Sequence, residues 1–197
     1  MTRQEEPVTI DGITGGTRSD RLWAAVAPVE PTGGSLCRAA IGGLRFLFGL
    51  LWLQGVGWKS PAVPFDQSSG FFYDFVEGAV SNEVFAPYAS VVETLVLPNW
   101  ALFAWATWIT EILLATFLVL GLATRLFALV GAGLSVGILL SVANTPDEWG
   151  WAYWMMIGGH LVLFATAAGR VGGLDGVARP GWLRSRHWLA RALVRAS

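Results

Sequence analysis

This chain of 197 residues has few side chains that bind metals or form disulfides. It contains one cysteine, Cys37, and two histidines, His160 and His187. A single cysteine excludes an intramolecular disulfide, a C-x-x-C redox pair and a cluster held by several thiolates within the chain. Two histidines are too few for a four-ligand zinc site, so a haem pair or a copper centre would need ligands from a partner. We also find no flavin motif and predict no metal site.

Charged residues are scarce as well, at 14% of the chain, whereas hydrophobic residues make up 54%. Soluble domains usually carry charge on about a quarter of their residues. The composition therefore predicts a membrane protein whose surface contacts lipids. The net charge of −1 gives no reason to expect a nucleic-acid partner.

Four apolar runs have the length of about twenty residues that a helix needs to cross a bilayer. They cover residues 38–58, 100–121, 125–143 and 150–169. We therefore expect an all-α fold, an integral membrane four-helix bundle over residues 38–175. Residues 1–37 contain TGGT and PTGG stretches and no apolar period, which predicts a disordered tail.

The distribution of arginines predicts that both termini face the cytoplasm, by the positive-inside rule. Arginines occupy the two tails and the turn between the second and third runs, at positions 18, 21, 38, 125, 170, 179, 184, 186, 191 and 195. The other two connections, 59–99 and 144–149, are acidic and are expected to face outward.

Three further segments show patterns of their own. Residues 70–85 place their apolar side chains on one helical face, which predicts a helix on the outer surface. Residues 88–97 are apolar but too short to span, so they form a re-entrant or lid segment. Residues 176–197 are a basic cytoplasmic tail, in which 182–195 is amphipathic and suits the anionic inner leaflet.

Three ionisable residues lie inside the apolar runs, where an unpaired charge costs several kcal/mol. They are Arg45, Glu111 and His160. Counted at about 1.5 Å per residue from the predicted inner helix ends, they share one layer. We predict an ion pair between Arg45 and Glu111, with His160 nearby. This pair either fixes the helix register around a hydrogen-bonded core histidine or lines a functional pocket.

In the functional interpretation, the layer binds and protonates a reducible head group. Glu111 and His160 are then the catalytic proton-handling residues, and Arg45 holds an anionic form of the ligand.

Four other residues are candidates for substrate or quinone binding. Trp108 and Trp154 offer flat apolar walls for a quinone ring, or serve in packing. Gln54 hydrogen-bonds either a ligand carbonyl or another helix. Lys59, at the predicted outer mouth, either attracts a small dianion or extends its ammonium group to water.

Three stretches carry a family resemblance: RAAIGGLRFLFGLLWLQGVGWK in the first run, WITEILLATFLVLGLATR in the second, and AAGRVGGLD after the fourth. Over about 38–175 the chain resembles the DoxX/DoxD family of bacterial and archaeal membrane proteins, which includes the larger, membrane-spanning subunit of thiosulfate:quinone oxidoreductase. Its recurrent polar positions correspond to Arg45, Glu111, Arg125, Arg170 and Asp175. As structural anchors, Arg125 and Arg170 would hold helix ends at the inner interface, and Asp175 would pair with either.

The resemblance implies a multi-pass protein of a prokaryotic plasma membrane with a redox role. It favours a membrane subunit of a quinone-linked oxidoreductase that oxidises thiosulfate to tetrathionate, with quinone as the cofactor-like substrate and a second subunit as partner. A non-catalytic adaptor of a redox or oxidative-stress complex is the alternative, and a small transporter or channel is a third. A homo-oligomer is compatible with all three.

Overall fold

The computed structural model describes residues 34–59 and 70–197, and every regular element within them is a helix, as the sequence predicts. The elements are α2 (Ser35–Trp58), α3 (Phe71–Ser81), α4 (Ala86–Val91), the π-helical turn η1 (Val92–Val96), the 3₁₀ turn η2 (Leu97–Asn99), α5 (Trp100–Leu120), α6 (Thr124–Val142), α7 (Gly150–Ala165), the 3₁₀ turn η3 (Ala168–Arg170), α8 (Leu174–Arg184) and α9 (Trp188–Ala196).

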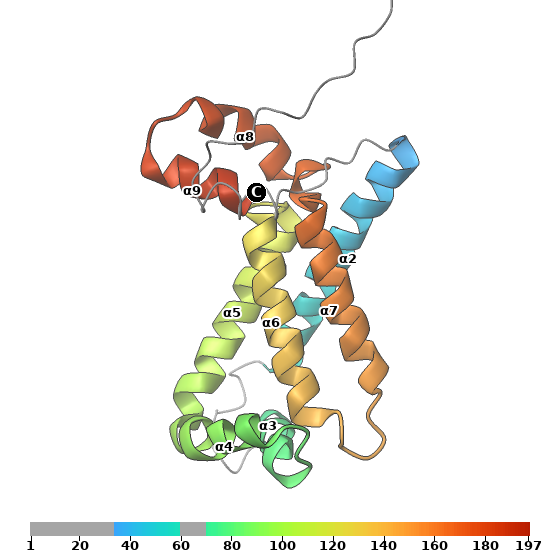
Figure 1. Ribbon diagram of the computed structural model, residues 1–197, viewed down its shortest axis with the longest axis vertical. Helices are drawn as coiled ribbons and strands as arrows, with labels where there is room; N and C mark the ends of the chain where they lie inside the picture. Colours follow the sequence, from blue (N-terminus) through green and yellow to red (C-terminus); the bar gives the residue numbers. More distant parts are fainter. Residues whose placement is uncertain (1–33, 60–69) are drawn as a thin grey trace, which may run out of the picture.

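Four long helices, α2, α5, α6 and α7, run along the long axis of the molecule (Figure 1). The short helices α3 and α4 lie at one end, and α8 and α9 lie at the other (Figure 1). We refer to these as the α3/α4 end and the α8/α9 end. Helix α2 packs mainly on α5, and α6 packs mainly on α7.

Among the residues that the structure describes, three segments are long and apolar enough to cross a membrane: Ser35–Trp58, Ala86–Leu120 and Thr124–Val142. They correspond to the first three predicted crossings. Helix α7, at the fourth, has 16 residues, fewer than the roughly twenty that span a bilayer. The fourth crossing and the orientation of the termini stay predictions.

The predicted N-terminal tail, 1–37, falls outside the described residues as far as position 33. Residues 35–37 belong to α2, which begins three residues before the predicted start of the first crossing. The helix therefore extends past Arg38 at the α8/α9 end.

The predicted re-entrant or lid segment at 88–97 is not separate from the second crossing. Helix α4, the turns η1 and η2, and α5 follow one another without a break, as a helical segment that bends. Pro98 lies at the bend, and a proline lacks the N–H that a continuous α-helix needs. The side chain of Asn99 donates to the carbonyl of Leu95 at 2.9 Å, one turn earlier in the bend.

The helix predicted within 70–85 is present as α3, which packs on α6. The amphipathic stretch 182–195 differs from the prediction, because the helix breaks at Ser185 and continues as α9. Arg179 of α8 donates to the carbonyl of Val194 at 2.6 Å and to Oγ of Ser197 at 2.7 Å. These bonds fold α9 back along α8.

Candidate functional site

A buried ion pair joins α5 to the residue that follows α2. The ammonium group of Lys59 donates to Oε1 of Glu111, and the two side chains are 6% and 1% exposed. Nζ of Lys59 also lies 4.6 Å from the ring centre of Trp58 and 5.2 Å from that of Phe72. Moving two charges out of water is costly, and mutual attraction together with the aromatic faces offsets that cost.

The predicted ion pair between Arg45 and Glu111 is therefore wrong. Arg45 lies near the α8/α9 end, where Nη1 donates to the carbonyls of Leu118 and, at 2.8 Å, Val119. Its Nη2 donates to the carbonyl of Gly172 at 3.4 Å. The last carbonyls of a helix lack intrahelical partners and attract cations, so the guanidinium caps α5 instead of reaching the carboxylate.

His160 occupies the core between the long helices, where its side chain is fully buried. Its Nε2 accepts a hydrogen bond from Nε1 of Trp52 at 3.0 Å, and its Nδ1 lies 2.8 Å from the carbonyl of Met156. A carbonyl only accepts, so Nδ1 carries the proton and Nε2 is the acceptor, as in a neutral imidazole. Both nitrogens are occupied within the core. The predicted proton-handling role of His160 stays untested.

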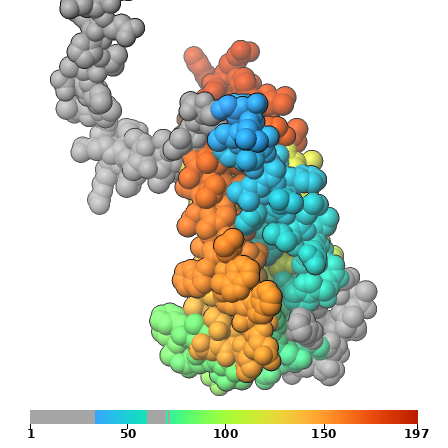
Figure 2. Space-filling model, turned by 90° about the vertical axis from the view of Figure 1, so that its right-hand side faces the viewer, coloured from blue at the N-terminus to red at the C-terminus, as the bar shows by residue number. Residues whose placement is uncertain are grey.

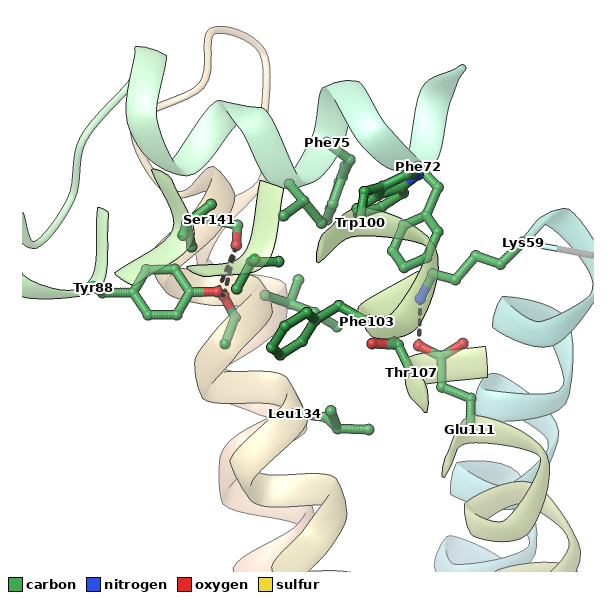
Figure 3. A pocket seen from close by; sticks show the side chains of 15 residues that line it. Lys59, Phe72, Phe75, Tyr88, Trp100, Phe103, Thr107, Glu111, Leu134 and Ser141 are labelled. Carbon is green, nitrogen blue, oxygen red and sulfur yellow. Dashed lines mark hydrogen bonds and ion pairs between the residues drawn. The ribbon is translucent and has the colours of Figure 1, made fainter. Parts of the chain in front are cut away.

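A cavity of about 170 Å³ lies beside the Lys59–Glu111 pair (Figure 3). Its walls are mainly aromatic and aliphatic, and they come from α3, α4, η1, α5 and α6. Lining residues other than the ion pair are Phe72, Phe75, Val76, Tyr88, Val92, Val96, Trp100, Phe103, Thr107, Leu134, Gly137, Ile138 and Ser141. We call this space the first cavity.

Polar groups lie on opposite sides of the first cavity (Figure 3). Lys59 and Glu111 lie on one side, with Thr107 next to them. On the other, the hydroxyl of Tyr88 is 3.0 Å from Oγ of Ser141. It also donates to the carbonyl of Gly137 at 3.2 Å. An elongated ligand with a polar atom at each end fits this arrangement.

Of the four predicted substrate- or quinone-binding residues, Lys59 lines the first cavity and the other three do not. Gln54 is exposed on α2, and Trp154 is 65% exposed on α7. Trp108 donates from Nε1 to the carbonyl of Val56 at 3.2 Å, which ties α5 to α2.

The GLATR and GRVGGLD stretches meet at the α8/α9 end. Oδ1 of Asp175 accepts from the backbone N–H of Ala123 at 2.7 Å, and Oδ2 accepts from that of Thr124 at 2.9 Å. The N–H of Asp175 donates to the carbonyl of Gly121 at 2.8 Å. Burial raises the pKa of Asp175, and the hydrogen bonds from Thr124 and Ala123 act in the opposite direction. Asp175 thus caps the start of α6.

Glycines make this junction possible. A Cβ on Gly169 would lie 2.1 Å from Oγ1 of Thr124, and one on Gly173 would lie 2.5 Å from the carbonyl of Gly169. Nearby, Nε of Arg125 donates to the carbonyl of Phe164 at 3.2 Å, and Arg170 donates to that of Ser197 at 3.1 Å. The contacts of these two arginines with helix-end carbonyls suit structural anchors.

The residues of the first cavity that the sequence did not single out are ordinary apolar and hydroxyl side chains. Tyr88 belongs to the segment predicted as a lid, and Ser141 is near the end of a predicted crossing. Neither residue carries a charge that would mark it as a candidate site within an apolar segment. Within residues 34–59 and 70–197, no group of three or more His, Cys, Asp or Glu residues is placed to hold a metal ion.

A family model described as "TQO small subunit DoxD" matches residues 42–187. The chain belongs to the DoxD family. The match runs from α2 to the residue before α9, so it includes the ion pair, the first cavity and the capping junction. The description gives DoxD as a small subunit, so the expectation of a larger subunit is wrong. No solved structure matches the chain.

Proposed function

We propose that this DoxD protein is the quinone-binding membrane subunit of a two-subunit oxidoreductase similar to thiosulfate:quinone oxidoreductase. Two observations support this proposal. The family description names a subunit of TQO, which we take to be thiosulfate:quinone oxidoreductase, and three helices have membrane-spanning length. In the proposed topology, α7 with η3 forms a fourth crossing, and both termini face the cytoplasm of a prokaryotic cell. The α3/α4 end then faces outward.

The observation that carries the proposal is the form of the first cavity. An apolar cavity of about 150 Å³ holds a benzene molecule, and the first cavity measures about 170 Å³. A quinone ring is flat and apolar, with a carbonyl oxygen at each of two opposite positions. Lys59 would donate to one oxygen. The hydroxyls of Tyr88 and Ser141 donate to the carbonyl of Gly137 in the structure and would rotate to donate to the other oxygen.

The Lys59–Glu111 pair supplies the chemistry that quinone reduction needs at one oxygen. A quinone takes up two electrons and two protons to become a quinol. The ammonium of Lys59 stabilises the negative charge that develops on the nearer oxygen, and Glu111, which accepts a hydrogen bond from Lys59, passes one of the two protons to it; the second proton comes from water. Oxidation of two thiosulfate ions to one tetrathionate releases the two electrons required.

Thiosulfate itself is assigned to the partner subunit. The charge of Lys59 is already neutralised by Glu111, and the surrounding walls are apolar. A dianion in this cavity would lose its hydration without a net positive charge to replace it. The hypothesis that Lys59 attracts the dianion therefore has no support from this geometry.

The test uses the full chain with its co-purifying partner, reconstituted in lipid nanodiscs. Thiosulfate-dependent quinone reduction and quinone binding are measured for the wild type, Glu111→Gln and Tyr88→Phe. We expect Glu111→Gln to lower turnover by about 10²-fold or more, as loss of a proton-transfer group does. Tyr88→Phe should weaken quinone binding by about tenfold, the effect of one hydrogen bond.

Glu93→Gln is the matched control, because Glu93 is an exposed carboxylate on η1 that does not line the cavity. Its activity should equal that of the wild type. Undiminished activity and quinone binding in Glu111→Gln would discard the site. A stable partner without any quinone binding would instead favour the adaptor function.

A further inference from the structure

A second cavity, of about 260 Å³, lies on the other side of the ion pair. Lys59, Glu111, Phe75 and Ile138 line both cavities and so form the wall between them. The remaining lining residues of the second cavity are Leu51, Trp52, Gly55, Trp58, Tyr153 and Met156. Helices α2 and α7 contribute all six of these residues, whereas neither α4 nor η1 contributes any.

An open apolar groove between α2 and α7 adjoins the second cavity. Its volume is about 760 Å³, and Leu51 and Met156 line both the groove and the cavity. Figure 2 shows the face on which α7, in orange, and α2, in blue to cyan, lie side by side. In the proposed topology this face contacts the hydrocarbon of the bilayer. A hydrophobic chain in the groove therefore has a continuous apolar path toward the ion pair.

One oxygen of Glu111 is not used by the ion pair. Among the described residues Oε2 has no hydrogen-bond partner, although the side chain is 1% exposed. It faces Gly55, where an added Cβ would lie 3.3 Å from it. A buried polar atom without a partner is costly, and a carboxylate oxygen only accepts hydrogen bonds. The missing partner is therefore a donor.

We propose that the second cavity and the groove bind a long-chain quinol, the reduced product of the reaction. Its phenolic O–H donates to Oε2 of Glu111, and its hydrocarbon chain lies in the groove between α2 and α7. A quinone has no O–H and gains nothing from Oε2. Lys59 faces both cavities, but the hydroxyls of Tyr88 and Ser141 line the first cavity and not the second. The inference rests on the proposed function and adds a separate product site to it.

Two glycines allow the two ends of this site to be blocked one at a time. Gly158 lines the groove, and a Cβ added there meets no atom within 4 Å, so Gly158→Leu fills the groove without a clash at its Cβ. Gly55→Ala places a methyl group against Oε2 at the head end. The matched controls are Gly133→Leu on α6 and Gly57→Ala on α2, both exposed and with no atom within 4 Å of the added Cβ.

The experiment measures binding to the full-length protein in nanodiscs of a fixed phospholipid composition. The ligands are a benzoquinol with a long alkyl chain, the same benzoquinol without the chain, and the oxidised quinone with the chain. We expect Gly158→Leu to weaken binding of the long-chain quinol by about tenfold or more and to leave the chainless quinol unchanged. Gly55→Ala should weaken both quinols by about tenfold, and the two controls should bind like the wild type.

Each result has a separate meaning. If Gly158→Leu binds the long-chain quinol as tightly as the wild type does, the groove is not the site of the chain. If Gly55→Ala weakens binding of the quinone and of the quinol equally, the site does not select the reduced form. Either result leaves quinone binding in the first cavity, tested by Tyr88→Phe, unaffected. If none of the three ligands binds to the wild type, both the inference and the proposed function are overturned.

Discussion

Lys59 and Glu111 form a buried ion pair between the end of α2 and the middle of α5, and a cavity lies on each side of it. The pair is thus both a contact between two helices and a shared wall of two binding spaces. Its contribution to stability can be separated from its contribution to ligand binding.

Removal of one charge of this pair should destabilise the protein more than removal of both. We expect Lys59→Met and Glu111→Gln each to lower the free energy of unfolding by about 3–5 kcal/mol, because each leaves the charge of the other residue buried without its partner. The double variant Lys59→Met/Glu111→Leu should recover most of that loss, because apolar side chains fill the site without a charge. Thermal unfolding in detergent measures the effect. A double variant no more stable than Lys59→Met alone would contradict the prediction.

Two glycines of α6, Gly131 and Gly133, should respond in opposite directions to substitution by alanine. At Gly131 an added Cβ would lie 2.2 Å from Nε2 of His160, whereas at Gly133 it meets nothing within 4 Å. We expect Gly131→Ala to cost about 1–3 kcal/mol by overpacking. Gly133→Ala should gain about 0.5–1 kcal/mol, because alanine loses less backbone entropy in a helix. Unfolding curves of the two variants provide the comparison, and similar changes in both would refute the placement of His160.

Asp175 should stabilise the start of α6 through its two acceptor oxygens. Asp175→Ala leaves the N–H groups of Ala123 and Thr124 without these acceptors and should cost about 2 kcal/mol or more. Asp175→Asn keeps one acceptor and should cost less. Glu77→Ala, an exposed carboxylate on α3, is the control. Hydrogen exchange at Ala123 and Thr124 reports the loss directly, and unchanged protection there would exclude the cap.

The single native cysteine gives a test of the proposed orientation. Cys37 is exposed at the start of α2, at the α8/α9 end. A membrane-impermeant maleimide should label it in inside-out vesicles and not in intact cells. Ser81→Cys in a Cys37→Ser background is exposed at the α3/α4 end and should show the reverse pattern. Labelling of Cys37 in intact cells would show that the α8/α9 end faces outward, opposite to the proposed orientation.

Hydropathy was sufficient to find the long helices. The run predicted at 125–143 corresponds to α6 (Thr124–Val142), and the run at 100–121 corresponds to α5 (Trp100–Leu120). Apolar length depends on the bilayer and is local in sequence, so it can be read without knowledge of the packing. The amphipathic period that predicts a helix within 70–85 is likewise local in sequence, and the helix is present as α3.

The partners of buried charges could not be predicted in this way. A count of residues from the predicted helix ends places Arg45 and Glu111 in one layer. The long side chain of Arg45 instead reaches the free carbonyls at the end of α5, which no count of residues along α2 reveals. The sequence marks Lys59 as a candidate, but its partner Glu111 lies 52 residues away, and their contact depends on how α2 and α5 are aligned.

The cap on α6 has a consequence for the order in which this protein is assembled. Chain synthesis proceeds from the N-terminus, so α5, α6 and α7 are all made before Asp175. Until then the N–H groups of Ala123 and Thr124 lack the carboxylate that binds them, and Arg45 lacks the carbonyl of Gly172. A nascent chain that stalls after α7 therefore holds an unfinished turn between α5 and α6. Emergence of α8 closes that turn and locks together helices that entered the membrane earlier.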